Sequence, residues 1–147
     1  MRTCTFFGHK DTPKELEPTL RSTLVDLIEN KNVLNFYVGN HGNFDYMVKC
    51  CLTELKKLYS IDYAVVLAYR PKIKCDSEQN SFTETILPDG IETVPRKFAI
   101  NYRNKWMIEH SDYVISYVKY DIGGAARFKE LAEKKNRIVI NIADQID

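Results

Sequence analysis

Short apolar runs alternate with longer amphipathic runs along the whole chain, and this alternation restricts the fold more than any other feature of the sequence. Short runs rich in β-branched and aromatic residues are typical of strands, and apolar residues that recur every three or four positions are typical of helices. Five strands are expected, at residues 3–7, 33–38, 63–69, 113–118 and 137–142. Helices are expected from about residue 18, over 44–59, over 96–110 and from residue 123. The pattern predicts an α/β domain in which a mostly parallel sheet carries helices on both faces.

The connections between these strands predict their order in the sheet. Right-handed crossovers from strand to helix to strand give a doubly wound, Rossmann-like domain with the order 3-2-1-4-5. The length of 147 residues fits a single domain over residues 1–147. In this order strands 2 and 3 are added on one side of the first strand, and strands 4 and 5 on the other. A ligand is expected in the crevice at the carboxyl ends of the first and the fourth strand, where this switch occurs.

Residues 70–97 interrupt the alternation. This segment contains three prolines and the turn Pro88-Asp89-Gly90. A connection this long inside a small domain is either functional or disordered. We expect a partly ordered loop near the ligand, with a short extended segment around residues 85–87.

Charge and composition narrow the class of partner. The 21 basic and 20 acidic residues give a formal net charge of +1, which offers no general reason to expect nucleic acid or a membrane as partner. No apolar run is long enough to cross a membrane, and the first residues do not resemble a signal peptide, so a cytoplasmic protein is expected. The four cysteines show no CxxC spacing and are interpreted as reduced thiols. Neither a metal site nor a cofactor is expected.

A glycine turn joins the second strand to the next helix, with the sequence Gly39-Asn-His-Gly42-Asn-Phe-Asp45. Glycine lets the backbone approach a phosphate closely, and a helix start offers N–H groups that lack partners. The two glycines could equally serve only a tight turn. Asp45 could hold a ribose hydroxyl, or it could simply complement the positive end of the helix dipole.

Other candidate residues follow the remaining strands or lie on the helices. His9 follows the first strand at the predicted switch point, where it could contact a ligand or bond a neighbouring carbonyl. Gly123 and Gly124 repeat the strand–loop–helix pattern of the first glycine turn. Arg103 and Glu130 lie on helices, where a charged residue usually faces solvent. The full set of expected ligand-binding residues is Gly8, His9, Lys10, Gly39, Asn40, Gly42, Asn43, Phe44, Asp45, Arg70, Arg103, Asn104, Gly123, Gly124 and Ala125.

Several of these motifs together resemble a known group. The ordered set resembles the SLOG superfamily, which includes the DprA-like proteins and the lonely-guy cytokinin-activating enzymes, and within it the small YpsA-type bacterial and phage proteins. The segments that carry the resemblance are Phe7-Gly8-His9-Lys10, the turn 39–45, Tyr102-Arg103-Asn104-Lys105-Trp106-Met107, Ser111-Asp112 and Gly123-Gly124-Ala125.

The resemblance implies a Rossmann-like fold that binds a nucleotide or a nucleotide-derived, ADP-ribose-like molecule, and it suggests a homodimer. Lonely-guy enzymes cleave the N-glycosidic bond of nucleoside monophosphates, and alignment with them places Arg103 and Glu130 on their catalytic arginine and glutamate. Their glycine-rich turn has a glycine and a threonine where this chain has Ala126 and Arg127. We therefore expect a binding module first, an N-glycoside hydrolase as the alternative, and a DNA-associated protein least.

Overall fold

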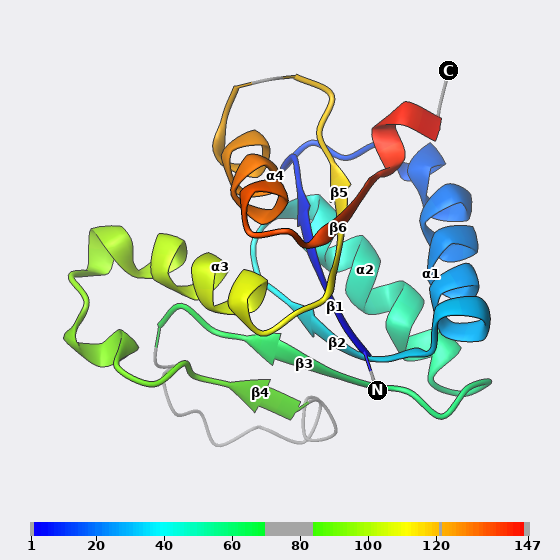
Figure 1. Cartoon of the computed structure of the whole chain (residues 1–147), viewed down its shortest axis with the longest axis horizontal. Coiled ribbons are helices and arrows are strands. Elements are labelled where there is room, and N and C mark those ends of the chain that lie inside the picture. The colour runs from blue at the N-terminus through cyan, green and yellow to red at the C-terminus, as the bar shows by residue number, and fades with distance from the viewer. Residues whose placement is uncertain (1, 70–83, 121, 146–147) are drawn as a thin grey trace.

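The computed structural model of the chain describes residues 2–69, 84–120 and 122–145, and it places a parallel sheet at the centre of the molecule (Figure 1). Within these residues the sheet has six strands in the order β4-β3-β2-β1-β5-β6, and every neighbouring pair is parallel. The strands are β1 Arg2–Gly8, β2 Val33–Val38, β3 Asp62–Val66, β4 Glu84–Ile86, β5 Tyr113–Tyr117 and β6 Ile138–Asn141.

Helices cover both faces of the sheet (Figure 1). The α-helices are α1 Glu17–Lys31, α2 Gly42–Leu55, α3 Ala99–Glu109 and α4 Gly124–Lys134. Short 3-10 turns lie at Lys14–Leu16, Ile91–Thr93, Arg96–Phe98 and Ile142–Gln145. Pro18 sits in the first turn of α1, where its missing N–H costs no hydrogen bond. Asn32 ends that helix in the left-handed conformation, with φ of 56°.

The predicted doubly wound α/β domain is confirmed, with one strand more than expected. The predicted order 3-2-1-4-5 corresponds to β3-β2-β1-β5-β6, and β4 adds a sixth strand beside β3. Only three residues form β4, and none of them is fully buried, so this edge strand leaves no apolar run in the sequence. The extended segment expected near residues 85–87 overlaps β4, whereas the part of the expected loop at residues 70–83 lies outside the described residues.

The second helix is shorter than its apolar pattern predicted. It ends at Leu55, and the chain then turns so that the N–H groups of Leu58 and Tyr59 both donate to the Leu55 carbonyl. Leu58 lies within the helix expected over 44–59, but it is 73% exposed. Apolar residues continue at helical spacing after Leu55, although the backbone is no longer helical there.

Two apolar cores pack against opposite faces of the sheet. Phe6 belongs to the core beneath α1 and α2, together with Leu24 and Leu52. Phe7, the next residue of β1, belongs to the core beneath α3 and α4, together with Phe128. Successive side chains of a strand point to opposite faces, so the central strand β1 contributes to both cores. Burying each such side chain stabilises the fold by about 1.5–3 kcal/mol.

No helix among the described residues combines the length and the apolar character that a membrane span requires.

Candidate functional site

A cavity of about 760 Å³ opens at the carboxyl ends of β1 and β5, where the strand order reverses. It lies between the loops that follow these strands and the helices α2, α3 and α4. The lining residues are Phe6, Phe7, Gly8, His9, Lys10, Asp11, Pro13, His41, Asp45, Ile100, Asn101, Arg103, Asn104, Met107, Tyr117, Lys119, Tyr120, Gly124, Ala125 and Phe128. The sequence predicted a crevice at this edge of the sheet. The expected ligand residues that line the cavity are Gly8, His9, Lys10, Asp45, Arg103, Asn104, Gly124 and Ala125.

Backbone N–H groups in the turn between β2 and α2 donate hydrogen bonds to acceptors within the protein. The N–H of His41 donates to Oδ2 of Asp45 at 3.0 Å. The N–H of Asn43 donates to the carbonyl of Lys10 at 3.2 Å. Gly42 has φ of +85°, a left-handed conformation that favours glycine, and it packs against the Lys10 backbone. Two N–H groups at the start of this helix therefore already have partners.

Gly39 makes room for two charged side chains. A Cβ atom at this position would lie 2.8 Å from Oδ2 of Asp45 and 3.1 Å from Nη1 of Arg103. Real Cβ atoms do not approach other groups so closely, so a larger residue would displace one of the two side chains. Glycine at this position is explained by packing within the protein, without a phosphate.

Arg103 is the most buried charged residue of the cavity wall, at 2% exposure. Its Nη1 donates to the carbonyl of Val66 at the end of β3 (3.0 Å), and its Nε donates to Oδ1 of Asn104 (2.7 Å). Burial lowers the pKa of Arg103, while the charges of Asp45 and Tyr69 oppose that shift. Arg103 thus joins α3 to the sheet as well as lining the cavity.

Asp45 supplies a carboxylate at the same wall. Burial raises the pKa of Asp45, and the N–H of His41 followed by the charges of Arg103 and Lys49 opposes that shift. His41 occupies Oδ2 only, and among the described residues nothing donates to Oδ1. The second oxygen is therefore available to a hydroxyl group of a ligand.

His9 ties the loop after β1 to the loop after β5. Its N–H donates to the Tyr117 carbonyl at 3.3 Å, and its Nε2 accepts the N–H of Lys119 at 2.8 Å. The neutral imidazole therefore carries its proton on Nδ1. Oγ1 of Thr12 donates to the His9 carbonyl at 2.7 Å, which fixes the backbone as well.

The start of α4 differs from the start of α2. Gly123 has φ of +101° and precedes the helix without a side-chain cap. A Cβ atom at Gly123 or Gly124 would meet nothing within 4 Å, so this turn is open. Gly124 and Ala125 line the cavity. Of the two glycine turns, the second is the one that leaves space for a ligand at a helix start.

Several expected ligand residues lie outside the cavity. Phe44 is fully buried, and a Cβ atom at Gly8 would lie 2.3 Å from its ring, so Gly8 permits this packing. Asn40 accepts a hydrogen bond from Nζ of Lys49 at 2.9 Å. Those outside the lining are Gly39, Asn40, Gly42, Asn43, Phe44 and Gly123. Arg70 lies outside the described residues.

The structure does not bring Glu130 and Arg103 together. Glu130 is exposed and pairs with Lys134 at 3.3 Å, one turn further along α4. It lines two neighbouring hollows of the surface rather than the cavity that contains Arg103. A helix turns by about 100° per residue, so Glu130, two positions from the buried residues Phe128 and Ala132, faces away from the core.

Some lining residues were not singled out in the sequence. His41 and Tyr120 lie within loops that were expected at this edge, but each resembles an ordinary polar turn residue. Lys119 lies two residues after the end of β5, and its position beyond the carboxyl end of a strand was the available signal. Asn101 and Met107 lie on α3, and only the observed rotation of that helix places them at the cavity.

The fold and the position of the cavity define a Rossmann-like domain with a crevice at the switch point of a parallel sheet. The chain is similar in structure to DNA processing protein A (DprA) from Streptococcus pneumoniae, solved by X-ray crystallography, with a TM-score of 0.67 and 13% sequence identity. The match covers 95% of this chain and 49% of that protein, so the chain spans about half of its length. No family model and no curated protein sequence matches the chain. At this identity the similarity establishes a DprA-like fold.

Proposed function

We propose that this chain binds a nucleotide or a nucleotide-derived, ADP-ribose-like molecule in the cavity, as a sensor or a sequestering module. The observation that carries the proposal is the composition of the cavity wall at the switch point. Lys10, Arg103 and Lys119 supply positive charge, and Asp45 supplies a partly free carboxylate. Open sheets of this kind bind ligands in the crevice beyond the carboxyl ends of their strands.

The wall offers a separate partner for each part of such a ligand. The N–H groups at the start of α4, near Gly124 and Ala125, suit a phosphate, with Lys119 beside the same loop. Oδ1 of Asp45 suits a ribose hydroxyl. The volume of about 760 Å³ lies within the range of about 300–1,000 Å³ that is typical of small-molecule sites.

The hydrolase alternative has less support. Cleavage of an N-glycosidic bond passes through a cation-like sugar, which a carboxylate beside the sugar must stabilise. Glu130 lies outside the cavity and Asp45 is partly committed to the backbone of His41. We keep hydrolysis as an outcome of the test, with Asp45 as its carboxylate.

Three further expectations rest on resemblance or on charge. We propose that the chain is related to the small YpsA-type proteins and that it forms a homodimer. We also expect that nucleic acid is not its main ligand, because the net charge is only +1. A measured mass near 17.1 kDa would contradict the dimer, and tight binding of single-stranded DNA at physiological salt would contradict the expectation on charge.

Thermal unfolding tests the proposed function directly. We expect AMP, ADP-ribose, NAD or a cyclic ADP-ribose isomer to raise the melting temperature of the wild-type protein. A ligand at one hundred times its Kd stabilises the folded state by about 2.7 kcal/mol. Lys119→Ala should weaken this effect, whereas Lys57→Ala, an exposed lysine outside the cavity, should leave it unchanged.

Chromatography of the incubated mixtures separates binding from reaction. Unchanged ligand is expected from a binding module, and release of free base, lost in Asp45→Asn, would favour the hydrolase. If none of these ligands shifts the melting temperature, the cavity does not have the proposed function.

A further inference from the structure

Tyr120 is 63% exposed, yet it is one of the residues that line the cavity. The centroid of its ring is 5.7 Å from that of His9, with 38° between the two planes. We propose that Tyr120 and His9 form a stacking platform for the base of the ligand, with a preference for purines. This inference rests on the proposed function and assigns the base of the ligand to two residues of the cavity wall.

The His9 side of the platform is held rigidly. The Lys119 N–H fixes Nε2, and the backbone of His9 is bonded on both sides by Tyr117 and Thr12. The Tyr117 ring meets the His9 ring edge-on, at 5.7 Å and 77°. Tyr117 itself is nearly buried and stacks on Phe44 at 6.4 Å. A ring that binds here meets an ordered surface, so little conformational entropy is lost on binding.

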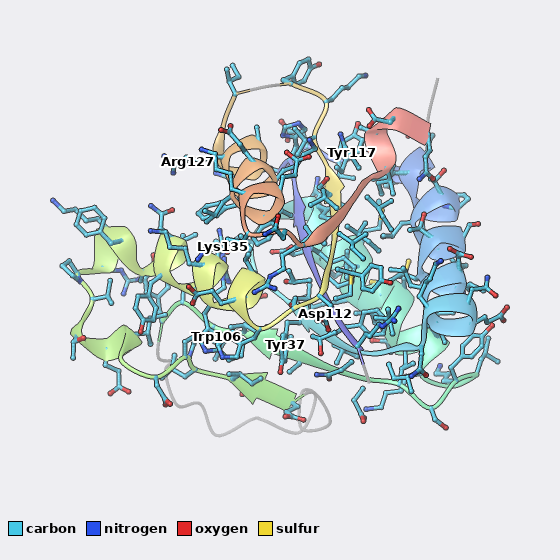
Figure 2. All side chains as sticks on the ribbon, viewed as in Figure 1. Tyr37, Trp106, Asp112, Tyr117, Arg127 and Lys135 are labelled. Carbon is cyan, nitrogen blue, oxygen red and sulfur yellow. The ribbon has the colours of Figure 1, made fainter. Side chains whose placement is uncertain are left out.

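Tyr120, the other ring of the platform, is largely exposed. Unlike its exposed neighbour Ile122, it lines the cavity. Ile122 is 80% exposed two residues further on, but it does not line the cavity. Tyr120 and Lys119 thus line the same space. In Figure 2, Tyr117 at the end of β5 and Arg127 lie on opposite sides of α4.

Two groups of residues in the cavity wall have different chemistry. The platform comes from the loops after β1 and β5, whereas Asp45, Arg103 and Asn104 come from α2 and α3. An aromatic surface selects a planar ring, and carboxylate and amide groups select hydroxyls. The base and the ribose of a nucleotide match these two groups, and its phosphate matches the N–H groups at the start of α4.

Stacking on aromatic side chains tolerates different bases, because every base has a π-face. We expect AMP and GMP to bind with similar affinity, and pyrimidine nucleotides to bind more weakly because their rings cover less of Tyr120. The base should contribute to binding affinity through the area that it stacks on Tyr120 rather than through hydrogen bonds.

Calorimetry with AMP and ribose 5-phosphate tests the platform. These ligands share ribose and phosphate and differ only in the base. Tyr120→Ala should weaken AMP binding by about tenfold, in line with the typical strength of base stacking, and leave ribose 5-phosphate binding unchanged. Tyr120→Phe should keep wild-type affinity for AMP. Tyr46→Ala is the matched control, because Tyr46 is 67% exposed and lies away from the cavity.

The outcomes separate the two proposals. If wild-type protein binds AMP and Tyr120→Ala has no effect, or weakens both ligands equally, the platform is wrong while the proposed function stands. If wild-type protein binds AMP but not ribose 5-phosphate, the base is essential, and loss of AMP binding in Tyr120→Ala supports the platform. If wild-type protein binds none of AMP, ADP-ribose, NAD and a cyclic ADP-ribose isomer, both proposals fail.

Discussion

Asp45 has a structural and a proposed functional role in one side chain. Its Oδ2 closes the turn before α2 by accepting the His41 N–H, and the residue also lines the cavity. Gly39 accommodates the same carboxylate, because any Cβ there would touch it. The turn and the cavity wall therefore depend on one another at the level of single atoms.

Replacing Asp45 by asparagine should make stability depend less on pH. The asparagine oxygen can still accept the His41 N–H, but it carries no charge. Burial raises the pKa of Asp45 from its ordinary value of 3.8, so the folded protein favours the protonated form. Relative to Asp45→Asn, the wild type should be most stable below pH 3.8 and should lose stability as the pH rises through the raised pKa.

Urea unfolding of both proteins between about pH 3 and pH 7 measures this difference, across the range in which carboxylates ionise. A wild type that gains stability relative to the variant over the same range would show that Arg103 and Lys49 outweigh burial.

At the scale of elements, Arg103 connects α3 to the carboxyl end of β3 through the Val66 carbonyl. The sequence suggested a solvated arginine or a phosphate partner. It could not indicate burial, because the rotation of α3 against the sheet depends on packing that the pattern of this helix only partly specifies. The strands were easier to locate, since an apolar run such as Val33–Val38 matches β2 at both ends.

Arg103→Met should destabilise the protein in the absence of any ligand. The Val66 carbonyl would lose its donor inside the protein, and an unsatisfied buried polar group costs about 1–3 kcal/mol. Lys105→Met on the same helix is the control, because Lys105 is exposed and surface changes are usually within about 0.5 kcal/mol. Guanidinium unfolding measures both. If Arg103→Met unfolds with wild-type stability and only ligand binding suffers, the residue serves the ligand alone.

At the scale of the whole molecule, β1 contributes side chains to two cores that lie on opposite faces of the sheet. Phe6 and Phe7 are neighbours in sequence and belong to different cores. Unfolding of one face should therefore remove support from the other, and the domain should unfold in one step.

Leu24→Ala tests this coupling, because Leu24 lies on α1 and is fully buried, whereas the single tryptophan, Trp106, lies on the other face. We expect a loss of about 2–5 kcal/mol, as for other buried leucines. The midpoint measured by Trp106 fluorescence should shift together with that measured by circular dichroism. A shift in circular dichroism alone would mean that the two faces unfold independently.

The gathering of loops at one edge was predictable, because parallel strands all end there. The sequence did not predict which backbone N–H groups remain free at that edge. The two glycine turns share a strand–loop–helix pattern, yet His41 and Asn43 already donate within the protein while the turn at Gly123 stays open. That difference depends on contacts with Lys10 and Asp45 that only the folded chain reveals.

The opposite edge of the sheet offers a practical use. Since all six strands run in the same direction, the returns from helix to strand, near Asn32, Ser60 and Asn136, lie at the end of the sheet away from the cavity. A fluorescent dye or a surface tether attached there would leave the cavity clear. The protein could then be immobilised as an optical reporter whose signal follows ligand concentration.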